Sequence, residues 1–321
     1  MKNEKIDLVY LWVDGSDSDW LKKKNKYLQS LNFEVTQDES GACRYIDNDE
    51  LKFSLRSVER YMPWINHIFI VTDNQIPSWL NLEYSKVSII DHKDIMNEDI
   101  LPTFNSMVIE ANIYKIPNLS DYFILANDDF FAYKDVPISF FFHKNKIPYC
   151  NFRHKLKDEA KTISTYSNCL LHTHELVKKK TGLKPPKFYP HHNMDAYTKS
   201  GYSFFYFLFF DEKKYLEKFK FRQVNLIERV GISYYLVATG RGVFRRIRKA
   251  KLFNALLSFF GINRVYSLYF SNQKRNIEQK LKLYRPYLFC INDGEGCTDE
   301  DRMYSKKLLL KLFPNKSSFE N

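Results

Sequence analysis

The sequence lacks the glycine-rich loops that most often hold nucleotide phosphates. Neither Gly-x-Gly-x-x-Gly nor Gly-x-x-x-x-Gly-Lys-Ser/Thr occurs in its 321 residues, which include only 10 glycines. A P-loop kinase and an NAD-dependent dehydrogenase are therefore not expected. Any nucleotide that this protein binds must be held by other groups.

Cysteine is also scarce, and long apolar runs are missing. The five cysteines show no Cys-x-x-Cys spacing, so we expect reduced thiols rather than a disulfide framework or a structural zinc site. Residues 1–12 lack the architecture of a signal peptide. The longest apolar stretch, residues 201–210, is too short to span a bilayer. We therefore expect a cytoplasmic protein, with peripheral contact at the inner face of the cell membrane left open.

Basic and aromatic residues, in contrast, are plentiful. The formal net charge is +11, and aromatic residues make up 17% of the chain. This charge suits an anionic partner such as a nucleotide diphosphate, a charged glycan or an acidic membrane. Nucleic acid is not expected, because the sequence contains no zinc-finger spacing, RNA-binding aromatic signature or helix-turn-helix pattern.

Strand-like and helix-like segments alternate along the first 150 residues. The expected strands are residues 6–13, 67–72, 87–90 and 121–125, and the expected helices are residues 19–31, 50–61 and 103–115. Such alternation is typical of an α/β fold with a mainly parallel sheet and helices on both faces. We expect a Rossmann-like or GT-A-like sheet.

The alternation fades after residue 150, which divides the chain into parts 1–150 and 151–321. Residues 151–200 are rich in Lys and His and are expected to form loops or an insertion. Residues 201–239 are expected to be helical, most clearly at 225–238. The short polar tail after Pro314 is expected to fray. The second part is therefore predicted to be mostly helical.

Two acidic motifs follow predicted strands. Asp14 comes after the first strand, and Asp128 and Asp129 come after the fourth. Ligands of parallel α/β sheets bind at the carboxyl ends of the strands. Carboxylates in this position suit Mg²⁺ or Mn²⁺ bound to a diphosphate. Turns and helix caps have the same composition, so spacing alone leaves both interpretations open.

A histidine pair and a late acidic turn are further candidates. His191 and His192 could supply a general base, because histidine titrates near neutrality, or could be exposed loop residues. Asp293 lies in an Asn-Asp-Gly turn and could reach an active site. Neither feature is specific by itself.

Residues 241–251 form a basic block, and residues 252–262 that follow are apolar. Charge for anionic lipid beside an apolar segment is typical of interfacial membrane binding. A solvated helical face leading into a core helix has the same pattern. Both readings stay open.

Four blocks of the sequence closely resemble the Stealth family. That family includes bacterial capsular polysaccharide phosphotransferases and the catalytic subunit of the animal N-acetylglucosamine-1-phosphotransferase. The blocks are IDLVYLWVDGSD at 6–17, a long stretch from RYIDNDELKFSLRSVERY at residue 44 to ILANDDFF at 131, PHHNMDAY with FRQVNLIERV at 190–230, and LFCINDGEG at 288–296. The second block is the most specific of the four.

The resemblance implies transfer of a sugar 1-phosphate from a nucleotide-diphosphate sugar to a hydroxyl of a glycan or a lipid-linked oligosaccharide. The donor is expected to be a UDP-hexose or UDP-N-acetylhexosamine, and UMP would leave as a phosphodiester forms in capsular or cell-surface polysaccharide synthesis. Residues 1–150 would bind the donor, and residues 151–321 would complete the acceptor side. The alternatives are a metal-dependent glycosyltransferase, which would release UDP, and a non-catalytic glycan-binding or membrane-binding protein.

Site residues follow from matching each block to the family. Asp128 and Asp129 match the acidic pair that would hold Mg²⁺ or Mn²⁺. The positions matched to donor binding are Asp14, Gly15, Ser16, Arg44, Arg56 and Asn105. The positions matched to the catalytic centre are His192, with His191 as the competing register, Arg222 and Asp293.

Overall fold

The computed structural model describes most of the chain. The described residues are 4–30, 45–144, 146–156, 165–192, 194–223, 226–248, 250, 253, 256–257, 265–294 and 296–321. Arg44, one of the predicted donor-binding residues, lies outside them.

A five-stranded sheet forms the centre of the molecule. Its strands are β1 (Ile6–Leu11), β2 (Ile68–Thr72), β3 (Val87–Asp91), β4 (Tyr122–Asn127) and β8 (Asp195–Thr198), in the order β3-β2-β1-β4-β8. All neighbours are parallel except β4 and β8, which are antiparallel. The expected α/β fold with a mainly parallel sheet is confirmed.

The strands form because their side chains alternate between two cores. Val9 of β1 packs in one apolar cluster, whereas Leu8 and Tyr10 pack in another on the opposite face. Successive side chains of a strand point to opposite faces, so a strand buried on both sides must be apolar throughout. This requirement explains the continuous apolar run that predicted the strand.

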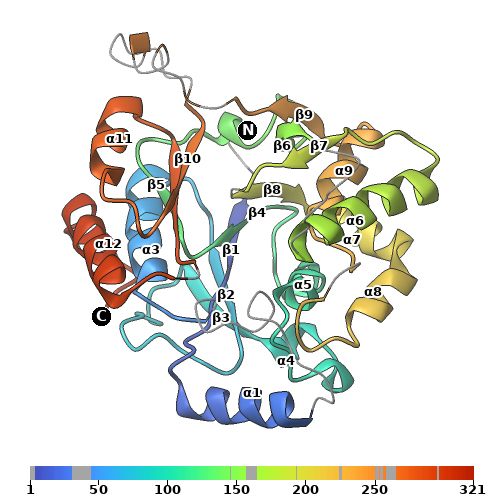
Figure 1. Ribbon diagram of the computed structural model, residues 1–321, viewed down its shortest axis with the longest axis horizontal. Coiled ribbons are helices and arrows are strands. Elements are labelled where there is room, and N and C mark those ends of the chain that lie inside the picture. Colours follow the sequence, from blue (N-terminus) through green and yellow to red (C-terminus); the bar gives the residue numbers. More distant parts are fainter. Residues whose placement is uncertain are drawn as a thin grey trace.

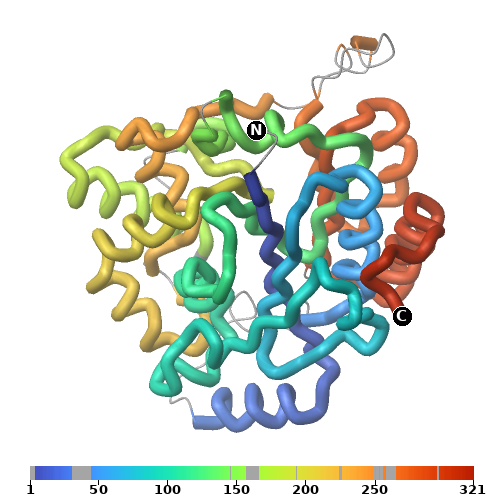
Figure 2. The backbone as a smooth tube through the Cα atoms, turned by 180° about the vertical axis from the view of Figure 1, so that it is seen from behind, coloured from blue at the N-terminus to red at the C-terminus, as the bar shows by residue number. Residues whose placement is uncertain are grey.

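Helices cover both faces of this sheet (Figure 1). Helix α3 (Glu50–Tyr61) lies on one side with α11 (Ile277–Tyr284) and α12 (Asp299–Leu312). The other side carries α5 (Ser106–Glu110), α6 (Thr165–Thr181), α7 (Lys199–Leu208), α8 (Phe210–Leu216) and α9 (Gly231–Ala238). The tube view from behind gives the same division (Figure 2), with α1 (Ser18–Ser30) running along one end.

Two smaller sheets join the halves of the chain. Strand β5 (Phe130–Ala132) pairs with β11 (Leu288–Asn292), and β11 pairs in turn with β10 (Ser267–Ser271). The other small sheet has the order β7-β6-β9, from Phe188–Pro190, Tyr149–Lys155 and Val243–Arg246. The second half therefore contributes strands as well as the expected helices.

Three expected elements differ from the structure. Within residues 151–200, α6 is a helix of 17 residues where loops or an insertion were expected; the polar Lys and His residues that suggested loops belong to this helix, and His174 is buried. The helix expected at 225–238 begins only at Gly231. The helix expected at 103–115 is the short α5, because Asn105 caps its first turn and Phe104 instead bonds to the carbonyl of Lys220.

The C-terminal tail does not fray, contrary to the prediction. Phe319 and Glu320 are buried, and the backbone of Asn321 donates to the carbonyl of Trp79. The Glu320 carboxylate accepts two hydrogen bonds from Arg56 of α3, at 2.7 and 2.6 Å. A charged tail is therefore fixed by one buried ion pair, which local composition does not reveal.

None of the described helices is both long and apolar enough to cross a membrane.

Candidate active site

A cleft of about 950 Å³ opens beside the carboxyl ends of β1 and β4. Both halves of the chain form its walls, which include Glu50, Asp128, Asp129, Arg153, His192, Arg222, Arg229 and Asp293. Acidic groups come mainly from the first half, whereas the three arginines come from the second. The cleft therefore brings opposite charges together across the two halves.

The acidic pair lies in the turn between β4 and β5, where the strand ends. Asp129 accepts a hydrogen bond from the Cys290 thiol at 3.1 Å, while its other carboxylate oxygen is buried without a partner. Burial, and then the charge of Asp129, raise the pKa of Asp128 well above its usual range. A cation would relieve both the repulsion and the unsatisfied oxygen.

Two further carboxylates, at the start of α3, belong to the same acidic corner. Burial raises the pKa of Glu50 to about 7, and burial with the nearby charge of Asp49 raises that of Asp47 to about 6. Both act electrostatically on Asp128. Sequence reasoning did not single them out, although both fall within the long second block of the resemblance.

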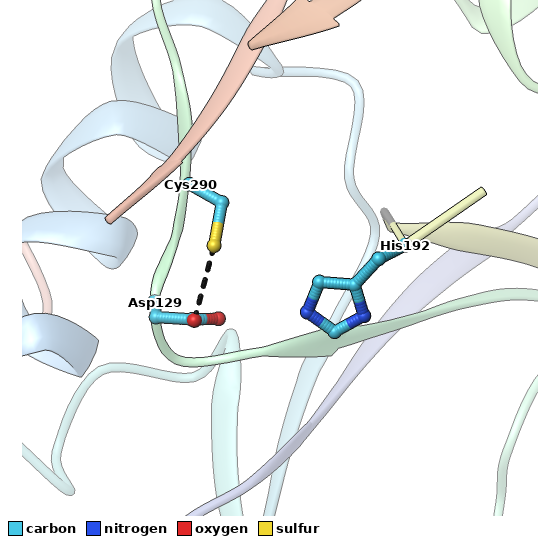
Figure 3. Close-up of side chains that lie close together, drawn as sticks. All are labelled: Asp129, His192 and Cys290. Atoms are coloured by element: carbon cyan, nitrogen blue, oxygen red, sulfur yellow. Dashed lines mark hydrogen bonds between the residues drawn. The ribbon is translucent and has the colours of Figure 1, made fainter. Parts of the chain in front are cut away.

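His192 lies close to Asp129 and Cys290 (Figure 3). A ring nitrogen of His192, a carboxylate oxygen of Asp129 and the Cys290 sulfur all lie within 4.8 Å of one another, close enough to bind one metal ion. Burial, and next the positive charge of Arg229, lower the pKa of His192 to about 3. The imidazole is therefore neutral and has a free lone pair near neutral pH.

His191 lies differently. Its backbone donates to the carbonyl of Asn151, and its Nε2 is 3.3 Å from the hydroxyl oxygen of Ser267. Those contacts hold it towards β6 and β10, although it also lines the cleft. Of the two registers left by the sequence, His192 is the one within ligand distance of Asp129.

Arginines line the wall formed by the second half. Arg222 donates to the hydroxyl of Ser106 at 2.9 Å, and Arg229 lies 3.5 Å from Glu110 and 3.4 Å from Asp195. The two nitrogens of Arg229 that face these carboxylates are buried and lie at ion-pair distance without a direct hydrogen bond. A guanidinium held in this way suits an additional anionic oxygen such as that of a phosphate.

Comparison with known proteins gives these features a context. Residues 4–32 match Stealth protein CR1, conserved region 1, and residues 44–150 match Stealth protein CR2, conserved region 2. The capsular polysaccharide phosphotransferase fcs1 of Haemophilus influenzae is 33% identical over 90% of this chain and 78% of its own length. The capsular polysaccharide phosphotransferase WcwK of Streptococcus pneumoniae is 32% identical over 100% of this chain and 99% of its own. The chain belongs to the Stealth family.

The expected family is thus confirmed, and this Stealth protein is a phosphotransferase. Among solved structures, the galactosyltransferase LgtC in complex with donor and acceptor sugar analogues aligns over 97% of this chain and 96% of that chain. The sequence identity is 11% and the TM-score is 0.48.

The CR1 region of this Stealth protein contains the first acidic motif, which forms a tight turn. The Asp14 carboxylate accepts from the backbone and hydroxyl of Ser16, at 2.8 and 2.6 Å. A Cβ at Gly15 would lie 2.2 Å from the carbonyl oxygen of Tyr45, so only glycine fits there. Asp17 caps α1 through the backbone of Trp20. The motif shapes the wall next to Trp12 and Val13, which line the cleft.

The CR2 region contains Asn105, which holds the segment just before Arg222 in place. Its amide donates to the carbonyls of Phe219 and Phe221, at 3.3 and 3.2 Å, and it is almost fully buried. These bonds hold the segment that leads directly into Arg222. Asn105 itself does not line the cleft, so its contact with a donor would be indirect.

Two other predicted residues have fixed partners. Arg56 lies outside the cleft, with its guanidinium bound to Glu320 and to the carbonyl of Phe313, so we do not include it in the donor site. Asp293 lines the cleft, and one of its oxygens accepts from Arg302 at 2.8 Å. Its other oxygen is buried without a partner, as in Asp129.

Proposed function

We propose that this Stealth protein transfers a sugar 1-phosphate from a UDP-hexose or UDP-N-acetylhexosamine to a glycan hydroxyl. The product is a phosphodiester, UMP leaves, and the reaction serves capsular or cell-surface polysaccharide synthesis. Support comes from the phosphotransferase relatives and from a cleft that places arginines opposite carboxylates. That opposition of charges is the observation that carries the proposal.

The arginine wall suits the diphosphate of the donor. Arg222 and Arg229 would bind its oxygens, because both line the cleft and each guanidinium is held in place, Arg222 by Ser106 and Arg229 by Glu110 and Asp195. An oxygen of the bound phosphate would lie between Arg229 and Asp195. Burial raises the pKa of Asp195 to about 7. Phosphoryl transfer needs such fixed positive charge around the equatorial oxygens.

The acidic corner suits Mg²⁺ or Mn²⁺. Asp128 and Asp129 would hold the ion, and the unsatisfied buried oxygen of Asp129 fits that assignment. Cys290 is close enough to Asp129 to take part, and it would favour Mn²⁺ over Mg²⁺ because sulfur is a softer ligand, while the lone pair of His192 is kept for proton transfer. A bound ion would neutralise charge on the diphosphate.

His192 is the proposed general base. It would take the proton of the acceptor hydroxyl as that oxygen bonds to the sugar-proximal phosphorus. The bond from this phosphorus to the bridging oxygen breaks, and the oxygen leaves with UMP. The neutral lone pair supports this role, and the negative charge of a bound diphosphate would raise the pKa of His192 towards the range of efficient proton transfer.

The decisive experiment identifies the released nucleotide. The purified chain is incubated with a panel of UDP-sugars, a glycan acceptor and Mg²⁺ or Mn²⁺, and nucleotides are separated by chromatography while ³¹P NMR follows the product. UMP with a new phosphodiester signal is expected. UDP with no phosphorus in the glycan would instead identify a glycosyltransferase and overturn the proposal.

Matched variants separate catalysis from folding. Asp128→Asn should abolish turnover, whereas Asp121→Asn, an exposed residue just before the same strand, should leave it unchanged. If both variants keep full turnover, the acidic pair has no role. If no donor is consumed by the unaltered chain under any condition tested, a non-catalytic binding protein becomes the better explanation.

We also propose that residues 1–150 bind most of the donor in the cytoplasm, while residues 151–321 add Arg222 and Arg229 at its diphosphate and complete the acceptor side. The membrane contact that the sequence predicts for residues 241–262 falls partly outside the described residues. Within the described part, Arg245 donates to Asn151 and to the hydroxyl of Tyr266, so this arginine serves the fold.

A further inference from the structure

Helices α7 and α8 expose aromatic residues where a surface helix is normally polar. In α7, Tyr202, Phe205 and Tyr206 are buried against the core. The outer face nevertheless carries Phe204 and Phe207, which are 51% and 78% exposed. A helix that is apolar on all sides normally has an apolar environment next to its outer face as well.

The exposed apolar side chains form a cluster. Phe210 and Tyr215 of α8 are 55% and 53% exposed, and Leu208 adjoins them. Five of the sixteen large hydrophobic side chains exposed among the described residues fall within residues 204–215. Single exposed apolar residues are ordinary, but a contiguous patch marks an interaction surface.

Lysines surround the same patch. A groove of about 1090 Å³ runs between α7–α8 and residues 97–115, lined by Phe204, Phe207 and Phe210 together with Lys115, Lys213, Lys214, Lys218 and Lys220. Lys213 is paired with Glu217. Among the described residues, no carboxylate forms an ion pair with Lys214 or Lys218, both of which are exposed. The groove contains five lysines against Asp99 and Glu217, so its charge is positive.

This groove is separate from the catalytic cleft. No described residue lines both, and α8 lies at the outer edge of the molecule, on the side away from α12 (Figures 1 and 2). Residues 217–222 connect them, because Glu217 lines the groove and Arg222 lines the cleft. A partner bound at the groove would therefore leave the cleft accessible.

We propose that the α7–α8 surface docks the protein onto a phospholipid bilayer with anionic headgroups. Phe207 and Phe210 would enter the boundary between headgroups and acyl chains, and Lys214 and Lys218 would contact headgroup phosphates. Phenylalanine beside lysine is the pairing that suits this boundary. The most exposed side chain of this surface is that of Phe207, which has no hydrogen-bonding group and suits an apolar environment.

The test measures co-sedimentation of the full chain with vesicles. Vesicles of phosphatidylglycerol and phosphatidylcholine should bind the protein, pure phosphatidylcholine should bind it far less, and salt should weaken binding. Lys214→Glu with Lys218→Glu should lower the partition coefficient more than about ten-fold, since each basic residue near an anionic surface contributes roughly five-fold. Phe207→Ser with Phe210→Ser should lower it by about ten-fold or more.

Matched controls lie on the opposite side of the molecule. Met303→Ser with Leu310→Ser removes exposed apolar side chains of α12, and Lys274→Glu with Lys307→Glu reverses two exposed lysines. Both controls should bind vesicles as the unaltered chain does. Release of UMP from the UDP-sugar in the presence of a soluble acceptor should be unchanged in all four variants. This measurement separates docking from the proposed chemistry.

Several results would overturn the docking proposal. One is equal binding to neutral and anionic vesicles, and another is loss of binding only when basic residues of 241–262 are replaced. A third is a dimer, seen by sedimentation, that dissociates in the double variant Phe207→Ser with Phe210→Ser. Binding of the lipid-free glycan at this groove, lost in the same variant, would identify a polymer site instead. Thermal unfolding of each variant checks that the fold is retained.

Discussion

Arg229 offers a sharp test, because it connects the stability of the fold to the proposed phosphate site. Its side chain is 7% exposed and lies between the carboxylates of Glu110 and Asp195, which are 10% and 11% exposed. Arg229→Met removes the only positive member of this trio. Removing one partner of a buried ion pair costs about 3–5 kcal/mol, because the remaining charge is left without compensation.

The loss in this case should lie near the lower end of that range. Burial already raises the pKa of Asp195 to about 7 while Arg229 is present, so without the arginine its carboxyl takes up a proton and becomes neutral. We therefore expect a loss of about 3 kcal/mol in the free energy of unfolding. For a chain of this size that corresponds to a melting temperature lower by roughly 6 °C.

The assay combines urea unfolding with donor binding. Adding Asp195→Asn and Glu110→Gln to Arg229→Met should recover most of the lost stability, because a neutral trio has no uncompensated charge. Binding of UMP and of the UDP-sugar, measured by calorimetry, should stay weak in the triple variant, because the guanidinium that would donate to the phosphate is still missing. Unchanged stability in Arg229→Met, or donor binding that returns with stability, would refute this reasoning.

Three further predictions concern catalysis, stability and pH. His192→Ala should reduce turnover by roughly a hundred- to ten-thousand-fold while the Kd for the donor changes little, and His191→Ala should have a much smaller effect; equal rates for both variants would remove His192 from the mechanism. Arg56→Met should lower the free energy of unfolding by about 3–5 kcal/mol, measured by urea unfolding, because it leaves Glu320 buried and unpaired, and its donor affinity should not change. Burial lowers the pKa of His92 from 6.5 to about 4, so below pH 6.5 the unfolded chain binds a proton at this residue while the folded chain does not. The free energy of unfolding should therefore fall by about 2 kcal/mol between pH 7.5 and pH 5, and this fall should be missing from His92→Gln. Parallel pH profiles of the two proteins would contradict this prediction.

The sequence predicted best where one pattern determines the structure. Helix α3 occupies residues 50–61 as expected, because its apolar face alone specifies a helix against the sheet. The strand expected at residues 6–13 is β1, Ile6–Leu11. Continuous apolar runs of this length have few other uses in a soluble protein.

Prediction was poorer where distant contacts decide the structure. The tail after Pro314 is polar, and it is ordered because distant groups hold it, among them Arg56, which pairs with Glu320, and the backbone of Trp79, which accepts from Asn321. Helix α5 is short because the segment around Lys220 and Phe221 occupies the place of its expected first turn. Neither partner can be identified from local sequence.

The candidate site was predicted in the same uneven way. The sequence placed Asp128 and Asp129 at a strand end, and the structure puts them in the turn after β4, in the cleft with His192. It did not single out Arg229 or Glu50, although both lie in the quoted blocks of the resemblance. Both are buried, and burial is a property of the assembled fold that local sequence does not reveal.

The division of charge across the cleft has a physical consequence for how the site forms. The acidic corner comes from residues 47–129, and the arginine wall comes from residues 153–229. Each cluster of like charge would be solvated in the unfolded chain and becomes buried only when β8 pairs with β4 and β11 pairs with β5. Desolvation then raises the pKa of Asp128 and Glu50, and Arg229 is buried at ion-pair distance from Glu110 and Asp195. A metal ion and a diphosphate carry the charges that would stabilise both clusters at once, so donor binding should increase the stability of the whole fold.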